Sequence, residues 1–202
     1  MIKNKNKEIN VVIFDCFGVL VQGTLDRFRE KYLAEKTDEE RNEFSDLSHA
    51  SDSGLISYDE CSRGAAKLAG ISVEDANKLF HDTPKNTALF EFIREKLRPA
   101  GYKIGLLSNI GQGRIAGVLS DEDLEVFDEK VLSCDVHMRK PDAEIYAFAA
   151  ETFDVEPKNC VFIDDVQENV LGAENVGMQG IVYRNFAEFR EKLTKILGNE
   201  EL

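Results

Sequence analysis

The stretch INVVIFDCFGVL, residues 9–20, decides the fold of this chain. It begins with a short apolar run rich in β-branched residues, which is typical of a buried strand in a parallel sheet. Asp15 follows at the carboxyl end of that strand, and Gly18 allows a sharp turn just after it. In open α/β sheets the ligand site lies outside the carboxyl ends of the strands. Asp15 is therefore a candidate functional residue, although an Asp that only caps a turn has the same local pattern.

The composition of the 202-residue chain predicts one compact domain with a small insertion. The 38 acidic residues outnumber the 25 basic ones, and the net charge of -13 argues against nucleic acid or an anionic membrane surface as the main partner. No stretch reaches transmembrane length, and residues 1–10 lack the apolar segment of a signal peptide. The four cysteines show no metal-ligand spacing, which favours buried thiols in a reducing compartment. We therefore expect a soluble, cytoplasmic protein.

Residues 22–83 contain almost no strand signal and are predicted to form about four amphipathic helices. Capping-box patterns at Thr37 and Ser57 predict where two of these helices begin. The segment follows the Asp15 turn directly, so we expect it to form a helical cap over the candidate site. The alternative is that these helices cover one face of the sheet.

An alternation of strands and helices returns at about residue 86, which is typical of a parallel sheet. The predicted fold class is therefore α/β: a three-layer, Rossmann-like parallel sheet with an inserted helical cap. Residues 1–21 and 84–202 would form the Rossmann-like core, and residues 22–83 the cap. The last five residues are predicted to fray. The later strands are predicted at residues 102–107, 131–133, 160–163 and 180–183, and the helices at 89–97, 143–153, 166–176 and 186–197.

Polar residues follow a strand or open the next helix at four places in this fold, and all four belong to the carboxyl edge of the sheet. Carboxylates about 4 Å apart repel each other by about 4 kcal/mol at an effective dielectric of ~20, so protons or a cation must relieve them. Carboxylate and carbonyl oxygens suit magnesium, which also binds substrate phosphates. Each place alone has a structural explanation, such as a helix N-cap or a surface lysine, but four at one edge favour a functional site. The four places are Asp15, Ser108-Asn109, Lys140 and Asp164-Asp165.

These motifs resemble those of the haloacid dehalogenase superfamily of hydrolases, most of whose members are phosphatases. The resemblance covers essentially the whole chain, and the predicted insertion resembles the small helical cap of that family. Any one of the four motifs has little specificity, but their occurrence in order is specific. The motifs lie at Val11–Leu20, Ile104–Asn109, Lys140–Tyr146 and Val161–Asn169.

The resemblance implies a catalytic or substrate-binding role for four of these residues. Asp15 would be the nucleophile that forms an aspartyl-phosphate intermediate. Lys140 would neutralise both the nucleophile and the group being transferred. Ser108 would donate a hydrogen bond to a phosphoryl oxygen, with the Asn109 amide nearby.

The resemblance also implies a Mg²⁺ cofactor. Its ligands would be Asp15, the backbone carbonyl of Phe17, Asp165, and Asp164 either directly or through water. Asn169 would support the metal-binding loop from behind. Three carboxylates, one divalent cation and one lysine together carry no net charge, which suits a site that receives a phosphate.

Phe17 departs from the family pattern, because phosphatases of the family usually carry a second Asp at this position as general acid and base. Proton transfer of this kind typically contributes about 10²–10⁴-fold to the rate. A substitute acid would have to come from the insertion. Asp52, Asp59 and Glu60 are the candidates, and the sequence does not distinguish between them.

We predict a magnesium-dependent phosphohydrolase that acts on a small phosphorylated metabolite through an aspartyl-phosphate on Asp15. One alternative is a weak or inactive family member with a binding or regulatory role. Another is a metal-independent 2-haloacid dehalogenase, since such relatives carry an aromatic residue at the position of Phe17. They lack the acidic pair, however, so Asp164 and Asp165 argue against this alternative. The sequence leaves the substrate and the oligomeric state open.

Four basic residues of the insertion could each face the site or the solvent, and two histidines of the insertion are expected to be structural. The substrate depends on the insertion, but any single basic side chain there is expected to be solvated. His137 stands where many relatives have Gly, so the loop before Lys140 could differ from theirs. The solvated residues would be Arg27, Lys36, Arg63 and Lys67, and the structural ones His49 and His81.

Overall fold

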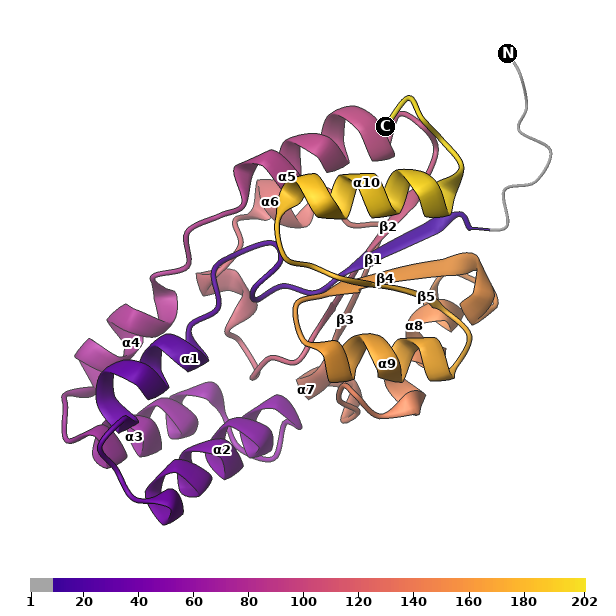
Figure 1. The fold of residues 1–202 in the computed structure, drawn as a ribbon. Coiled ribbons are helices and arrows are strands. Elements are labelled where there is room, and N and C mark those ends of the chain that lie inside the picture. Colours follow the sequence, from indigo (N-terminus) through magenta and orange to yellow (C-terminus); the bar gives the residue numbers. More distant parts are fainter. Residues whose placement is uncertain (1–8) are drawn as a thin grey trace.

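The computed structural model describes residues 9–202 and contains a five-stranded, wholly parallel sheet covered by helices on both faces (Figure 1). The strand order is β3-β2-β1-β4-β5, so the first strand lies at the centre. This architecture confirms the predicted α/β class. The strands are β1 (Val11–Phe14), β2 (Lys103–Ser108), β3 (Glu129–Leu132), β4 (Cys160–Asp164) and β5 (Gln179–Val182).

The register of the central strands brings the predicted site residues together. Phe14 pairs with Leu106 on one side and with Ile163 on the other. Asp15 and Asp164 are the next residues along their strands, so both lie at the carboxyl edge of the sheet. The chain builds β2 and β3 on one side of β1 and then returns to build β4 and β5 on the other. The edge between β1 and β4 is thus the topological switch point, where ligands bind in open α/β sheets.

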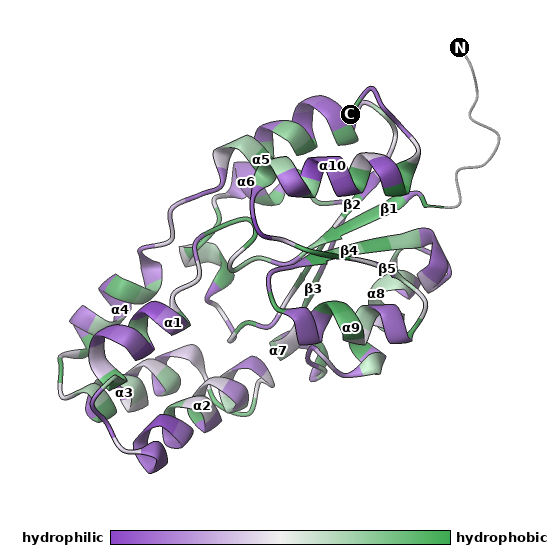
Figure 2. Ribbon diagram, in the orientation of Figure 1, coloured by the Kyte–Doolittle hydropathy of each residue, from purple (hydrophilic) through white to green (hydrophobic). Residues whose placement is uncertain are grey.

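Two separate hydrophobic clusters cover the two faces of the sheet, because alternate strand residues point to opposite sides. Figure 2 shows the central strands β1 and β4 in hydrophobic colours and mixed colours on the surrounding helices. One face is covered by α5 (Thr87–Phe92), the π-helical turn η2 (Ile93–Leu97), α6 (Asp121–Leu124) and α10 (Phe186–Leu197). The other is covered by α8 (Ala143–Thr152) and α9 (Gln167–Asn175).

Helices dominate residues 22–83, and they bury a third hydrophobic cluster of their own. At its centre the ring of Phe28 stacks on Phe44 and Phe80, with both centroid distances 4.9 Å. The capping boxes predicted at Thr37 and Ser57 are present at the starts of α2 and α3. The elements are α1 (Leu25–Phe28), the π-helical turn η1 (Arg29–Leu33), α2 (Asp38–Asp52), α3 (Tyr58–Ala69) and α4 (Val73–His81).

The carboxyl end of α2 rests on the core, beside the short helix α7 (Ser133–Val136). The Ser133 hydroxyl donates a hydrogen bond to the carbonyl oxygen of Asp52. His137 Nδ1 lies 3.0 Å from the carbonyl oxygen of Ser53. His137 has a φ of 55°, a left-handed conformation that favours glycine.

Several local expectations differ from the structure. The second strand, β2, lies one residue later than predicted. The third strand ends at Leu132 rather than Ser133, because Ser133 begins α7. The fifth strand is Gln179–Val182, one residue earlier than predicted. Fraying of the last residues is wrong for Leu202, which is buried in the core and whose carbonyl oxygen accepts a hydrogen bond from Arg190 Nε at 2.8 Å. No helix in residues 9–202 combines the length and the apolar character needed to cross a bilayer.

Candidate active site

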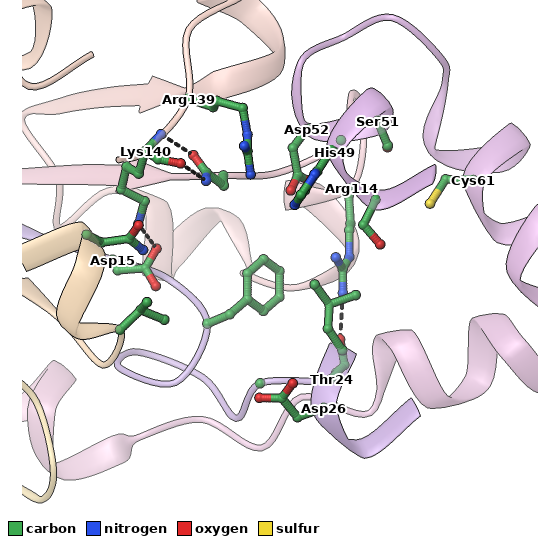
Figure 3. A pocket seen from close by; sticks show the side chains of 18 of the residues that line it. Asp15, Thr24, Asp26, His49, Ser51, Asp52, Cys61, Arg114, Arg139 and Lys140 are labelled. Atoms are coloured by element: carbon green, nitrogen blue, oxygen red, sulfur yellow. Dashed lines mark hydrogen bonds and ion pairs between the residues drawn. The ribbon is translucent and has the colours of Figure 1, made fainter. Parts of the chain in front are cut away.

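A cavity of about 590 Å³ lies between the carboxyl edge of the sheet and the helical insertion (Figure 3). From the core, Asp15, Lys140 and Asp165 reach its wall, and from the insertion Asp52 and Tyr58 do so. The insertion therefore forms part of the wall of the pocket that contains Asp15. The division of the chain into a core and a cap at residues 22–83 stays a prediction.

Lys140 lies between two buried carboxylates at the floor of the cavity. Its Nζ donates hydrogen bonds to Asp15 Oδ1 at 2.6 Å and to Asp164 Oδ2 at 2.7 Å. The three side chains are almost completely inaccessible to solvent. Burial alone would lower the pKa of Lys140, but the two carboxylates outweigh it and raise that pKa. Lys140 is therefore held as a cation against Asp15.

The side chain of Asn109 forms two hydrogen bonds with the backbone of Lys140. Its Nδ2 donates to the Lys140 carbonyl oxygen, its Oδ1 accepts from the Lys140 amide, and both distances are 2.9 Å. The side chain also lines the cavity. Asn109 thus links the loop after β2 to the loop that carries Lys140. Its predicted proximity to a phosphoryl group stays a prediction.

Asp164 has both carboxylate oxygens engaged. Oδ1 accepts from the Val166 amide at 2.8 Å, and Asn169 Nδ2 lies 3.2 Å from Oδ1 and 3.0 Å from Oδ2. Together with the bond from Lys140, these contacts satisfy Asp164 in a fully buried position. Asn169 therefore holds Asp164 in place, which is consistent with the supporting role expected for it.

The carboxylates of Asp15, Asp164 and Asp165 form the acidic cluster that the sequence predicts. One oxygen from each lies within 4.8 Å of the others. Burial, together with repulsion from Asp164, raises the pKa of Asp15 to about 7 against the opposing effect of Lys140. Desolvation and then repulsion from Asp164 raise the pKa of Asp165 to about 6, although this side chain keeps some exposure to solvent. A cation would relieve this repulsion.

The donor set fits magnesium. Octahedral coordination at about 2.1 Å places ligand oxygens within roughly 4.2 Å of one another, so only small side-chain movements are needed. Asp165 is the more available ligand, because both oxygens of Asp164 already have partners. Asp165 also lies directly over Gly18, where a Cβ would stand 2.0 Å from Asp165 Oδ2. With a φ of 85°, Gly18 is required both by the turn and by this close approach.

Ser108 ends β2 and is completely buried. Its hydroxyl lies 3.5 Å from the carbonyl oxygen of Asn109, and the residue is absent from the wall of the cavity. Its contact with a phosphoryl oxygen stays a prediction, and would require some rearrangement at the end of β2.

Phe17 follows Asp15 by two residues and has a half-buried side chain. Its ring lines the cavity and lies under the guanidinium group of Arg114, whose Cζ is 4.4 Å from the ring centroid. The position thus supplies an aromatic surface instead of a proton donor. The metal-ligand role of the Phe17 carbonyl stays a prediction.

The structure distinguishes between the three acids that could replace the missing one. Asp52 lines the cavity, and burial raises its pKa to about 6 against the nearby positive charges, of which Arg114 has the largest effect. Asp59 is exposed and lies outside the cavity wall. The Glu60 carboxylate accepts hydrogen bonds from the Ser57 amide and hydroxyl in the capping box. Asp52 is therefore the remaining candidate.

Several cavity residues were not anticipated from the sequence. His49, expected to be structural, lines the cavity, as do Arg29, Arg114 and Arg139. Arg139 is adjacent to Lys140 in the chain, and this adjacency was a usable signal. Arg114 lies in a loop without periodicity, where no sequence pattern marks it. None of the four basic residues expected to be solvated lines the cavity. Arg63 and Lys67 are exposed, whereas Arg27 and Lys36 are half-buried and pair with Asp82 and Glu40.

Comparison with known proteins identifies the class of protein. The family model for haloacid dehalogenase-like hydrolases matches residues 9–177. The chain therefore belongs to the haloacid dehalogenase-like hydrolase family.

Individual relatives of the chain differ in activity. Bifunctional epoxide hydrolase 2 of Rattus norvegicus is 36% identical over 74 residues, which cover 37% of this chain but only 13% of that protein. A sesquiterpene phosphatase of Aspergillus oryzae is 26% identical over 132 residues, 63% of this chain and 67% of the relative. Dehalogenases are also among the matched proteins.

A solved structure shares the fold. A HAD family enzyme from Bacteroides thetaiotaomicron, crystallised in complex with magnesium and inorganic phosphate, superposes with a TM-score of 0.72. The match covers 90% of this chain and 98% of that one, at 23% sequence identity. At this identity the likeness establishes the fold alone.

Proposed function

We propose that this protein is a magnesium-dependent phosphohydrolase that acts on a small phosphate ester. The observation that carries the proposal is the buried Lys140 held between Asp15 and Asp164 at the floor of a cavity. The magnesium and phosphate bound by the Bacteroides enzyme support it, as does the phosphatase activity named for the Aspergillus oryzae relative.

Asp15 is the nucleophile in this proposal. One carboxylate oxygen attacks phosphorus, the ester P–O bond breaks, and the leaving oxygen departs with the electron pair and takes up a proton. Water then attacks phosphorus of the aspartyl phosphate, which releases inorganic phosphate and restores the Asp15 carboxylate. Lys140 orients Asp15 through its 2.6 Å hydrogen bond and neutralises charge near the group being transferred.

The magnesium ligands in the proposal are Asp15, Asp165, the Phe17 carbonyl and Asp164, the last directly or through water. When bound, the ion supplies positive charge that stabilises the phosphoryl oxygens. Asn169 acts through Asp164, which it holds in place. Phe17 cannot protonate the leaving oxygen. Asp52 is the proposed proton donor. Esters with good leaving groups depend on it least, because such groups depart without being protonated.

A dehalogenase function has less support. The aromatic Phe17 agrees with it, but a displacement without metal gives no use for the cluster of Asp15, Asp164 and Asp165. A binding or regulatory protein without turnover would keep the same cluster, and an activity measurement distinguishes it from an enzyme.

The test is a phosphate-release screen of small phosphate esters with magnesium or with EDTA, using wild type and Asp15→Asn. We expect release by wild type with magnesium, and losses of at least about 10³-fold with EDTA and with Asp15→Asn. Activity that survives both changes would overturn the mechanism. Magnesium binding without turnover of any ester would favour a binding protein. Release of chloride from 2-chloropropionate without metal would favour a dehalogenase.

A further inference from the structure

Two arginine side chains in the wall of the cavity have no carboxylate partner. Arg114 comes from the loop after β2, and Arg139 from the loop that precedes Lys140. The buried Nε atoms of both lack a hydrogen-bond partner among residues 9–202. Within the same residues neither guanidinium forms an ion pair with a carboxylate. Two unpaired guanidinium groups in one pocket are unusual in a chain with a net charge of -13.

The guanidinium group of Arg114 is held in place by its neighbours. It is 93% buried by the rings of Phe17, Tyr58 and Phe80, with Cζ 4.4, 5.6 and 5.7 Å from their centroids. Its Nη2 donates to Thr24 Oγ1 at 2.8 Å. Aromatic rings occupy the faces of the guanidinium, so its edge remains for hydrogen bonding. A buried polar group without a partner is costly, and an external ligand would remove that cost.

Figure 3 shows Arg139 and Arg114 extending into the cavity away from Asp15 and Lys140, with His49 and Asp52 between them. Asp52 interacts electrostatically with both Arg114 and Arg139. Two guanidinium groups and this one carboxylate together carry a net positive charge. Of the other acidic residues of the wall, Asp26 already pairs with Arg29 at 2.9 Å, and Asp15 and Asp165 belong to the acidic cluster. The last one, Glu168, stands in the first turn of α9, three residues after Asp165. This part of the cavity is therefore suited to an anion.

We propose that Arg114 and Arg139 bind a carboxylate of the substrate, so that the substrate is a phosphate ester that also carries a carboxylate. A carboxylate is planar and matches the open edge of a guanidinium with two parallel hydrogen bonds. The inference rests on the proposed function, because it assumes that the phosphoryl group lies at Asp15. It assigns the chemical class of substrate, which the residues around Asp15 leave open.

The test measures binding without turnover, by titration calorimetry in the presence of magnesium. The probes are phosphonocarboxylic acids of increasing chain length, each compared with the phosphono-alcohol of the same length. We expect one length at which the acid binds wild type at least about 10-fold more tightly than the alcohol. Arg139→Gln should reduce this preference by roughly 10-fold or more. Arg139 is the first choice because it is less buried than Arg114, and Arg114→Lys tests the second guanidinium while keeping its charge.

Arg29→Gln is the matched control, because Arg29 lines the same cavity but is already paired with Asp26. It should change the preference for the acid by less than about 2-fold. Equal binding of acid and alcohol at every length would overturn the inference, as would equal effects of Arg29→Gln and Arg139→Gln. Tighter binding of a bisphosphonate than of every phosphonocarboxylate would also overturn it, in favour of a second phosphate.

Phosphate release from simple esters separates this inference from the proposed function. If esters are hydrolysed but acids gain no advantage over alcohols, the inference fails and the function stands. If no ester is hydrolysed and no phosphonate binds, both fail.

Discussion

Lys140 is the cation that pairs with the two buried carboxylates of Asp15 and Asp164. Without it, both carboxylates would be buried with no positive partner. We expect Lys140→Met to lower the free energy of unfolding by about 3 kcal/mol at neutral pH, because breaking a buried ion pair from one side leaves an uncompensated charge. The loss should shrink as the pH falls below about 7, where burial makes Asp15 take up a proton. Urea unfolding monitored by circular dichroism measures it.

Lys195→Met is the control for this prediction. Lys195 pairs with Glu191 at 2.6 Å, but both side chains are well exposed, so the loss should be much smaller than for Lys140→Met. Equal losses in the two variants would show that the Lys140 bridge adds nothing to stability.

The buried Asp52 carboxyl should make the stability of the protein depend on pH. Burial raises its pKa in the native state from 3.8 to about 6, so between these values the folded protein binds a proton that the unfolded chain has released. Stability from this residue therefore falls as the pH rises from about 4 to about 6. Asp52→Asn should become more stable relative to wild type across that window, by up to about 3 kcal/mol. A stability difference that stays constant from pH 4 to pH 7, measured by urea unfolding, would contradict this.

At the scale of elements, the contact between α2 and the core depends on Gly54. Gly54 has a φ of 71°, and a Cβ there would lie 2.6 Å from the carbonyl oxygen of Cys134. Gly70 has a φ of 69° but has no atom within 4 Å of a Cβ position. Gly70→Ala should cost about 1–2 kcal/mol of unfolding free energy through its backbone conformation alone. Gly54→Ala should cost more, because the core backbone must also move.

Calorimetric melting of the two glycine variants provides the comparison. If both variants lose the same stability, the end of α2 does not pack against the core as described. A larger loss for Gly54→Ala would support the close contact between the insertion and the α7 region.

Much of the element pattern could be predicted because it is local. The apolar run before Asp15 marks a buried strand, and the capping boxes mark the starts of α2 and α3. The start of α7 at Ser133 could not be predicted, because its strand-like neighbours Val131 and Leu132 gave no sign of where the pairing ends. The burial of Leu202 depends on tertiary packing and leaves no periodic signal.

The acidic cluster could be predicted because each member stands at a strand end, and strand ends of a parallel sheet meet at one edge. The position of Arg114 in the cavity wall could not be predicted, because basic residues in loops are usually solvated. Arg139 differs, because it is adjacent to Lys140 in the chain. Asn109 is an intermediate case. Its position was predicted, whereas its two hydrogen bonds to the Lys140 backbone were not.

At the scale of the whole molecule, the core and the insertion have separate hydrophobic clusters and share one cavity. The core supplies Asp15, Lys140 and the acidic pair, and the insertion supplies His49 and Asp52. The unpaired arginines belong to the core. The substrate should therefore depend on both parts of the chain, rather than on the insertion alone as the sequence suggested.

The central claim is that Asp15 accepts a phosphoryl group. Its most direct test is acid quenching during turnover of a phosphate ester with magnesium, followed by mass spectrometry of the peptide that contains Asp15. We predict that this peptide gains the mass of one phosphoryl group, and that the gain is absent in Asp15→Asn and in EDTA. Phosphate release by wild type with no phosphoryl group on Asp15 at any quench time, together with full activity of Asp15→Asn, would contradict the account.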